Sequence, residues 1–285
     1  MLKSLHDLLK LDQLTEIVDV GANPIDGDPP YKALLGAGLC RVTGFEPQQD
    51  ALAKLNQSKS ALENYLPYAV GDGTTKTLNI CRYSGWTSTL KPSAASLNVF
   101  PIFEQNAQII RQVPLETKRL DNIAEIERID FLKIDIQGGE LVALQNARRL
   151  LATASVIQIE VSFVTLYDDQ PGLGEIDVEL RRQGFMPHCF AAVKKGLIAP
   201  LVINNNPWQP INQLLEADMV YVKDFRDAGP LSDEQLKNIC LIAHACYGSF
   251  DLAFRCLLVL EGRKAVEAKA GEKYLALMAA PAARA

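Results

Sequence analysis

The segment Phe131–Glu140, with the sequence FLKIDIQGGE, decides the fold of this chain. Its first half consists mainly of strong strand formers, and its second half passes through two glycines to a carboxylate. A short apolar run that ends in a glycine turn is typical of a buried parallel strand followed by a helix. Residues two positions apart on a strand share a face, so Lys133 and Asp135 are predicted to project together near the end of this strand.

Similar patterns surround this segment on both sides. Apolar or β-branched runs predict further strands at Glu16–Val20, Arg41–Phe45, Tyr65–Val70, Ser155–Val161, Phe185–Val193 and Met219–Lys223. Helical spacing between them, as in Gln48–Asn56 and Glu175–Gln183, completes an alternation of strands and helices. This alternation predicts an α/β fold with a doubly wound, mostly parallel sheet. The segment Ser84–Val113 lacks clean periodicity, and we expect an irregular insertion with a functional role there.

The character of the chain changes after Lys223. We expect residues 1–226 to form one α/β domain that starts with a helix over residues 1–14, and residues 227–285 to form a helical C-terminal extension. Ser232 is predicted to cap the first helix of the extension, with Gln235 in the capping-box position. The extension is expected to pack on the main domain or on a partner, which would include a second copy of the chain.

Composition excludes some classes of protein. The 285 residues carry a net charge of −5, which disfavours a nucleic-acid binder, since such proteins use basic groups to neutralise phosphates. The sequence shows neither a secretory signal nor a run long and apolar enough to span a bilayer, so we expect a cytoplasmic protein. The six cysteines lack metal-ligand spacing, and we predict reduced thiols and no metal site.

Candidate ligand-binding residues follow the first predicted strand, because ligands of doubly wound sheets bind beyond the carboxyl ends of the strands. Asp19 could orient a cationic group, Gly21 would allow close approach of a ligand, and Asn23 follows in the same turn. The next loop, Pro24–Pro30, lacks the GxGxxG pattern and adds acidic residues. Acidic residues would repel a pyrophosphate, so this turn suits a ligand that carries positive charge.

Two further acidic residues follow the second and third strands. Glu46 could accept two hydrogen bonds from vicinal ribose hydroxyls, and its alternative is an exposed acid before Pro47. Asp72 could accept a hydrogen bond from an exocyclic adenine amine. The sequence Gly71-Asp72-Gly73 is also typical of an ordinary turn, so Asp72 is the weaker candidate.

The charged residues at the ends of the fourth and fifth strands are candidates for chemistry. Charged side chains are seldom buried without partners, so Lys133 and Asp135 suggest an open site at the sheet edge, with a structural ion pair as the alternative. Glu160, on the strand Ser155–Val161, is predicted to point towards the same edge.

Together these segments resemble the FkbM family of S-adenosylmethionine (SAM)-dependent methyltransferases over Glu16–Lys223. The resemblance rests on VDVGAN (Val18–Asn23), GFEP (Gly44–Pro47), AVGD (Ala69–Asp72), RLD (Arg119–Asp121) and FLKIDIQGGE (Phe131–Glu140). The last run is similar to the family's K-I-D-x-E-G-x-E signature, but Gln137 stands where the family usually has Glu. The loop Pro24–Pro30 also replaces the family's smoother glycine turn.

The resemblance implies a class I methyltransferase (Rossmann-like) fold, with a seven-stranded sheet whose last strand is antiparallel, and SAM as the cofactor. By position, Asp19, Gly21 and Asn23 would hold the methionine portion of SAM. Glu46 would bind the ribose, and Asp72 would lie on the adenine side.

The resemblance further implies methylation of a hydroxyl on a sugar, a lipid-linked glycan or a secondary metabolite. A hydroxyl becomes more acidic as it attacks the methyl group, so a nearby base would help. Asp135, which the resemblance places near the sulfonium and the acceptor, is the first candidate for this base, and Glu160 is the second. Lys133 would position or polarise the acceptor.

Two other functions stay open. Gln137 and the helical extension also suit a non-catalytic module that binds the cofactor and serves assembly. A nicotinamide-dependent oxidoreductase is the third and least favoured hypothesis.

Overall fold

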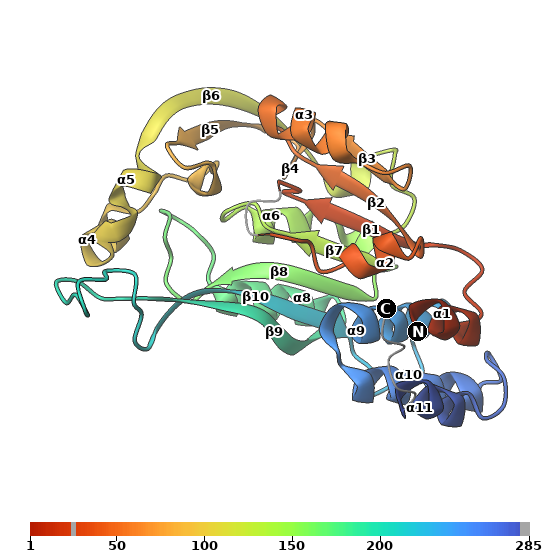
Figure 1. Cartoon of the computed structure of the whole chain (residues 1–285). Coiled ribbons are helices and arrows are strands. Elements are labelled where there is room, and N and C mark those ends of the chain that lie inside the picture. Colours follow the sequence, from red (N-terminus) through yellow and green to blue (C-terminus); the bar gives the residue numbers. More distant parts are fainter. Residues whose placement is uncertain (24–26, 280–285) are drawn as a thin grey trace.

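The expected doubly wound sheet is present in the structure, a computed structural model that describes residues 1–23 and 27–279 (Figure 1). Its strands are β1 (Thr15–Val20), β2 (Cys40–Phe45), β3 (Glu63–Leu66), β7 (Phe131–Ile134), β8 (Val156–Ser162), β9 (Phe185–Gly196) and β10 (Gln213–Lys223). They lie in the order β3-β2-β1-β7-β8-β10-β9. Only β10 runs against the others, because it pairs antiparallel with both β8 and β9. This arrangement confirms the predicted sheet.

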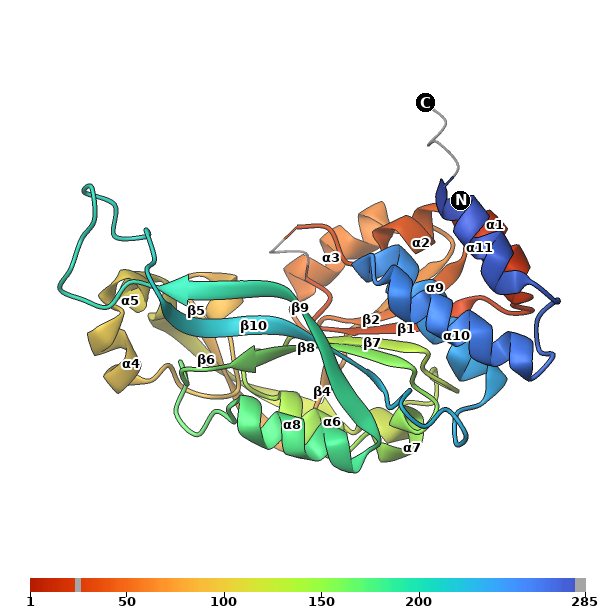
Figure 2. The same cartoon turned by 90° about the horizontal axis from the view of Figure 1, so that it is seen from below.

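Helices cover both faces of the sheet (Figure 2). One face carries α1 (Leu2–Leu9), α2 (Lys32–Gly36) and α9 (Asp233–Tyr247), with α10 (Phe250–Gly262) and α11 (Ala270–Ala279) on the same side. The other face carries α6 (Glu140–Gln145), α7 (Arg148–Leu151) and α8 (Leu173–Arg182). Every residue of β8 is buried, as expected for a central strand with an apolar layer on each face.

The C-terminal helices supply part of the core beneath the sheet. Ile239 of α9 is fully buried in the same hydrophobic cluster as Phe131 and Val220 of the strands. The predicted capping box is present: Ser232 Oγ accepts from the backbone of Gln235 at 3.1 Å, and Gln235 Oε1 accepts from the backbone of Ser232 at 3.1 Å. These helices therefore pack on the main sheet, one of the two locations that the sequence predicts. No helix in the described ranges is long and apolar enough to cross a membrane.

The predicted single strand Tyr65–Val70 is wrong in its extent. Strand β3 ends at Leu66, because Pro67 has no N–H to donate to a neighbouring strand. The chain then enters a second sheet of order β4-β6-β5, built from β4 (Ala69–Val70), β5 (Thr75–Cys81) and β6 (Ile109–Lys118). The segment Ser84–Val113 is accordingly less irregular than predicted: its end lies in β6, and it contains α4 (Ala94–Val99) and α5 (Glu104–Ala107).

Candidate active site

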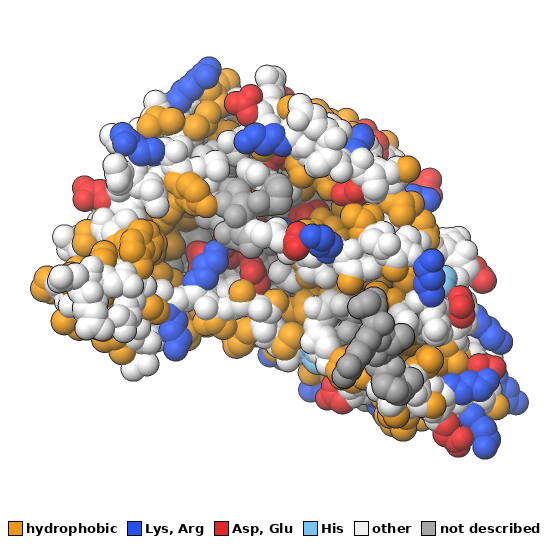
Figure 3. Space-filling view, viewed as in Figure 1, with side chains coloured by type: hydrophobic (Ala, Val, Ile, Leu, Met, Phe, Trp, Pro, Cys, Tyr) orange, Lys and Arg blue, Asp and Glu red, His pale blue; other side chains and the backbone are white. Residues whose placement is uncertain are grey.

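A cavity of about 1090 Å³ opens at the carboxyl ends of β1, β2 and β7. In Figure 3 it is the hollow at the centre of the molecule, with charged side chains at its floor. One half is lined by residues that follow β1 and β2, and the other by the insertion after β5 and by residues of β9 and β10. Ligand pockets usually measure roughly 300–1,000 Å³, so this cavity is large enough for an extended ligand.

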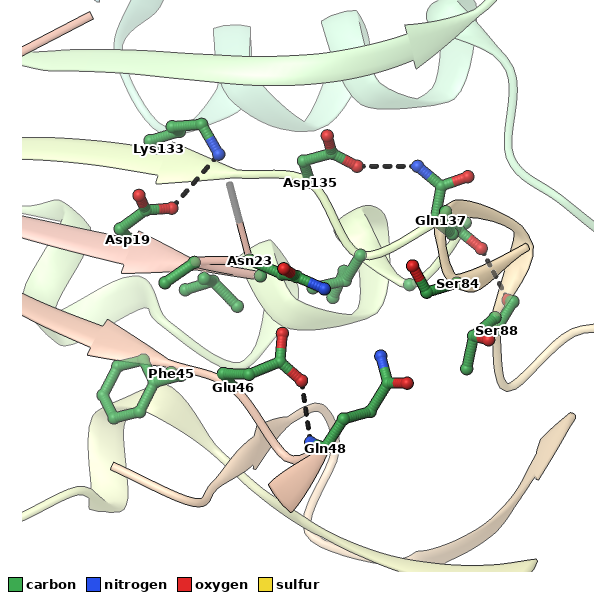
Figure 4. A pocket seen from close by; sticks show the side chains of 18 of the residues that line it. Asp19, Asn23, Phe45, Glu46, Gln48, Ser84, Ser88, Lys133, Asp135 and Gln137 are labelled. Atoms are coloured by element: carbon green, nitrogen blue, oxygen red, sulfur yellow. Dashed lines mark hydrogen bonds and ion pairs between the residues drawn. The ribbon is translucent and has the colours of Figure 1, made fainter. Parts of the chain in front are cut away.

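The pairing of β1 with β7 places Asp19 beside Lys133. Lys133 Nζ lies 3.2 Å from Asp19 Oδ1 (Figure 4). The hydroxyl of Tyr31 donates to Asp19 Oδ2 at 2.6 Å. Burial acts to lower the pKa of Lys133, but the charges of Asp19 and Asp135 outweigh it and raise this pKa above its usual value. Lys133 therefore forms an ion pair and also lines the cavity, so both of the roles considered for it are compatible with the structure.

Gly21 follows β1 with a positive φ of 81°. A Cβ atom at this position would meet the backbone oxygen of Asp135. The glycine is thus needed where two strand ends converge, and both Gly21 and Asp135 line the cavity. Asn23, two residues later, also lines the cavity (Figure 4).

Glu46 ends in the cavity although its side chain is almost inaccessible to solvent. The backbone N–H of Gln48 donates to Glu46 Oε1 at 2.7 Å. Burial raises the pKa of Glu46 to about 7, and the hydrogen bond from Gln48 opposes this shift. Glu46 is therefore a buried carboxylate of the cavity and not an exposed turn acid.

Asp135, Gln137 and Glu160 form one hydrogen-bonded group. Gln137 Nε2 donates to Asp135 Oδ1 at 2.8 Å and to Glu160 Oε2 at 2.9 Å. Asp135 lines the cavity, whereas Glu160 is buried and is not among the described lining residues. Burial, followed by the charges of Asp135 and Glu216, raises the pKa of Glu160 well above its usual value.

Carboxylate oxygens of Asp135, Glu140 and Glu160 can lie within 4.8 Å of one another, an arrangement that could attract a cation. Protein donors already bind these groups, because Glu140 accepts from the backbone of Ile136 and Gly138 and the other two accept from Gln137. Burial also raises the pKa of Glu140 to about 7. These carboxylates therefore belong to one hydrogen-bond network.

Asp72 is not brought to the cavity with the other candidates. Its carboxylate accepts from Lys76 at 2.8 Å and from the hydroxyl of Thr74 at 2.6 Å. These hydrogen bonds hold the pKa of Asp72 well below its usual value. Val70 and Gly71 line the cavity, but Asp72 is not among the described residues that do so. Its contact with adenine stays a prediction from the sequence.

Four aromatic residues that the sequence did not assign to the site form one wall of the second half of the cavity. The ring centroids of Trp86 lie 5.4 Å from Phe103 and 5.5 Å from Tyr167, and Phe103 lies 5.8 Å from Trp208. All four residues line the cavity. They are separated along the chain. One signal for this wall in the sequence was the irregular insertion Ser84–Val113, which contains Trp86 and Phe103.

The loop Pro24–Pro30 is described only in part. Gly27 to Pro30 line the cavity, and Asp28 pairs with Lys32 at 2.6 Å. Residues 24–26 lie outside the described residues.

The sequence profile of the Methyltransferase FkbM domain matches residues 19–187. A comparison with curated proteins finds no match. Among solved structures, magnesium protoporphyrin IX methyltransferase from Synechocystis PCC 6803 is similar with 9% identity and a TM-score of 0.38, covering 78% of each chain. Precorrin-6y C5,15-methyltransferase from Geobacter metallireducens GS-15 is similar with 11% identity and a TM-score of 0.35, covering 78% of this chain and 87% of the other.

Proposed function

The chain belongs to the FkbM family of methyltransferases, and we propose that it transfers a methyl group from SAM to a hydroxyl on a sugar, a glycan or a secondary metabolite. One observation carries this proposal: Asp19, Glu46 and Asp135, from the ends of three adjacent strands, line a single cavity. Acidic groups suit a donor with a positively charged sulfur and hydroxyls on its ribose.

The residues around Glu46 fit the nucleoside part of SAM. A carboxylate buried at this strand end can bind both ribose hydroxyls. Phe45 and Tyr68 stack beside it with ring centroids 6.2 Å apart, and both line the cavity with Val70. Flat apolar side chains of this kind suit a purine base. Asp19 and Asn23 would bind the methionine portion, with Gly21 giving it access to the backbone.

SAM supplies a methyl group that is activated by the sulfonium. The chain's own contribution is to orient the acceptor hydroxyl for in-line attack and to accept its proton. Asp135 is the better candidate for this base because it lines the cavity, whereas Glu160 lies behind Gln137. Lys133 would position the acceptor from its ion pair with Asp19. The aromatic wall would exclude water from the acceptor.

The test is incubation of purified protein with methyl-labelled SAM and fractionated metabolites and glycans, followed by mass spectrometry. We expect one component to gain a methyl group on oxygen. The Asp135→Asn variant should lose roughly 10²- to 10⁴-fold in turnover, the usual contribution of a general base. Asp50→Asn, an exposed change on α3 (Gln49–Ser58), is the matched control and should keep full turnover.

Other results would support the alternatives. SAM binding without methyl transfer to any fraction would favour the assembly module, and selective binding of NAD would favour an oxidoreductase. Unchanged turnover in Asp135→Asn would remove Asp135 from its assigned role.

Location, domain division and oligomeric state are proposed from the sequence as well. We place the protein in the cytoplasm and keep a division into residues 1–226 and an extension of 227–285. Leu258 and Leu275 of the extension are 44% and 51% exposed, which supports a homo-oligomer formed through α10 and α11. Sedimentation of the wild-type protein and of the Leu258→Ser, Leu275→Ser double variant tests this proposal. We expect an oligomeric wild type and a monomeric variant, and a monomeric wild type would contradict the proposal.

A further inference from the structure

We propose that Gln137 is a positioning residue that aims the carboxylate of Asp135 at the methyl donor. This inference rests on the proposed function, because it assumes that Asp135 faces the sulfonium of SAM. It concerns the position at which this chain departs from the FkbM signature.

The backbone around Gln137 is held from both sides. Gln137 has a positive φ of 57°, a conformation that costs energy for a residue with a Cβ. Ser88 Oγ donates to the backbone oxygen of Gln137 at 2.6 Å (Figure 4), and Glu140 accepts from the N–H groups on either side. These contacts fix the direction in which the side chain leaves the loop.

Both the nitrogen and the oxygen of the Gln137 side-chain amide form hydrogen bonds. Its Nε2 donates to the carboxylates of Asp135 and Glu160, as described above. Its Oε1 accepts from the hydroxyl of Tyr167 at 2.9 Å. This orientation of the amide satisfies all three partners, because ionised carboxylates accept and the phenol here donates.

The amide thereby binds one oxygen of Asp135 and leaves the other for the cavity. No described residue donates to Asp135 Oδ2. A carboxylate at position 137 could not make these contacts, since it has no N–H and would add a negative charge beside Asp135, Glu140 and Glu160. Lys194 pairs with the other oxygen of Glu160 at 3.5 Å, and Gln137 adds a donor with a fixed direction between Glu160 and Asp135.

Tyr167 extends this arrangement to the acceptor side. Its ring packs against Trp86 in the aromatic wall, and its hydroxyl orients the amide of Gln137. The wall that would hold the acceptor is thus connected to Asp135 through two hydrogen bonds.

The test compares SAM, whose sulfur is positively charged, with S-adenosylhomocysteine (SAH), whose sulfur is neutral. Both affinities are measured by calorimetry, so no acceptor is needed. Gln137→Met keeps the length of the side chain and removes its donors. If Gln137 aims Asp135 at the sulfonium, this variant should bind SAM about tenfold more weakly and SAH within about twofold of wild type. A merely structural role would weaken both ligands alike.

Two further variants complete the design. Gln183→Met is the matched control, because Gln183 Nε2 donates to a carboxylate, Glu179, at 2.8 Å but lies outside the cavity lining. It should change neither affinity. Tyr167→Phe removes only the hydroxyl that orients the amide, and should lower SAM affinity less than Gln137→Met while leaving SAH affinity unchanged. It provides the same comparison if Gln137→Met does not fold.

The outcomes separate the two proposals. If the wild type prefers SAM and the folded Gln137 and Tyr167 variants keep the same ratio of SAM to SAH affinity, the role of Gln137 is overturned and the proposed function stands. If the wild type binds neither ligand, the proposed function itself is wrong, and the role of Gln137 is overturned with it.

Discussion

A Cβ atom added to Gly21 would lie 1.9 Å from the backbone oxygen of Asp135. The end of β1 and the end of β7 can approach this closely only because position 21 has no side chain. Asp19 lies two residues before Gly21, and Asp135 supplies the contacted oxygen, so the glycine allows the two segments that carry these acids to converge.

Gly21→Ala should therefore separate the strand ends and weaken SAM binding. We expect a loss of at least about 2 kcal/mol in the free energy of unfolding, from strain at positive φ together with the clash. Denaturant unfolding and calorimetry with SAM measure the two effects.

Gly38→Ala is a suitable control, because Gly38 also has a positive φ, of 72°, but no described atom lies within 4 Å of an added Cβ. It should cost about 1 kcal/mol and leave SAM affinity unchanged. Equal effects of both substitutions would show that the contact with Asp135 has no importance of its own.

SAM binding should strengthen as the pH rises through about 7, the raised pKa of Glu46. Below this pH the buried carboxyl is protonated in the free protein, and ribose hydroxyls bind the ionised form better. Binding should consequently release protons near neutral pH. Calorimetry in buffers of different ionisation enthalpy measures this release.

Glu46→Gln should abolish the proton release and lower SAM affinity by about tenfold, the loss expected for a hydrogen bond to a charged group. Glu127→Gln, at an exposed position outside the cavity lining, serves as the control. Proton release that persists in Glu46→Gln would assign the titration to another group.

Removal of Lys133 should destabilise the fold. Lys133→Met leaves Asp19, which is 2% exposed, without its cationic partner, and we expect a loss of about 3 kcal/mol in unfolding free energy. The double variant Asp19→Asn, Lys133→Met should recover part of this loss, because no unpaired charge remains. Urea unfolding of the single and double variants tests the coupling.

Lys32→Met breaks an exposed ion pair with Asp28 and should change stability by less than about 1 kcal/mol. A similar small effect of Lys133→Met would contradict the importance of the buried pair.

The C-terminal helices should unfold together with the sheet. Ile239 of α9 is completely buried, so Ile239→Ala should cost about 3 kcal/mol and shift one cooperative transition. Val178→Ala, at an exposed position of α8, should cost less than about 1 kcal/mol. A separate early transition in Ile239→Ala would show that α9 unfolds independently of the sheet.

Local patterns were sufficient for the parts of the fold that depend on local physics. The apolar run before Asp135 predicts β7, and Ser232 with Gln235 predicts the start of α9, because strand burial and helix capping depend on residues close in the sequence. Parallel strands place their carboxyl ends at one edge, so the convergence of Asp19, Glu46 and Asp135 also follows from the sequence.

Other features depend on contacts between distant residues, and the sequence did not reveal them. Strands β5 and β6 pair antiparallel across the insertion that separates them in the sequence. No short-range hydrophobic pattern in the sequence predicts this pairing. The partners of Lys133 and Gln137 depend on the register between strands and on which side chains meet across it.

The sequence by itself thus determined the main sheet and the acidic edge where a ligand binds. Only the tertiary structure decided that Lys133 pairs with Asp19, that Gln137 links Asp135 to Glu160 and Tyr167, and that Asp72 stays outside the cavity. The physical reason is that a hydrogen bond or an ion pair requires atoms within about 3 Å, and such proximity between residues far apart in the chain is set by packing and register.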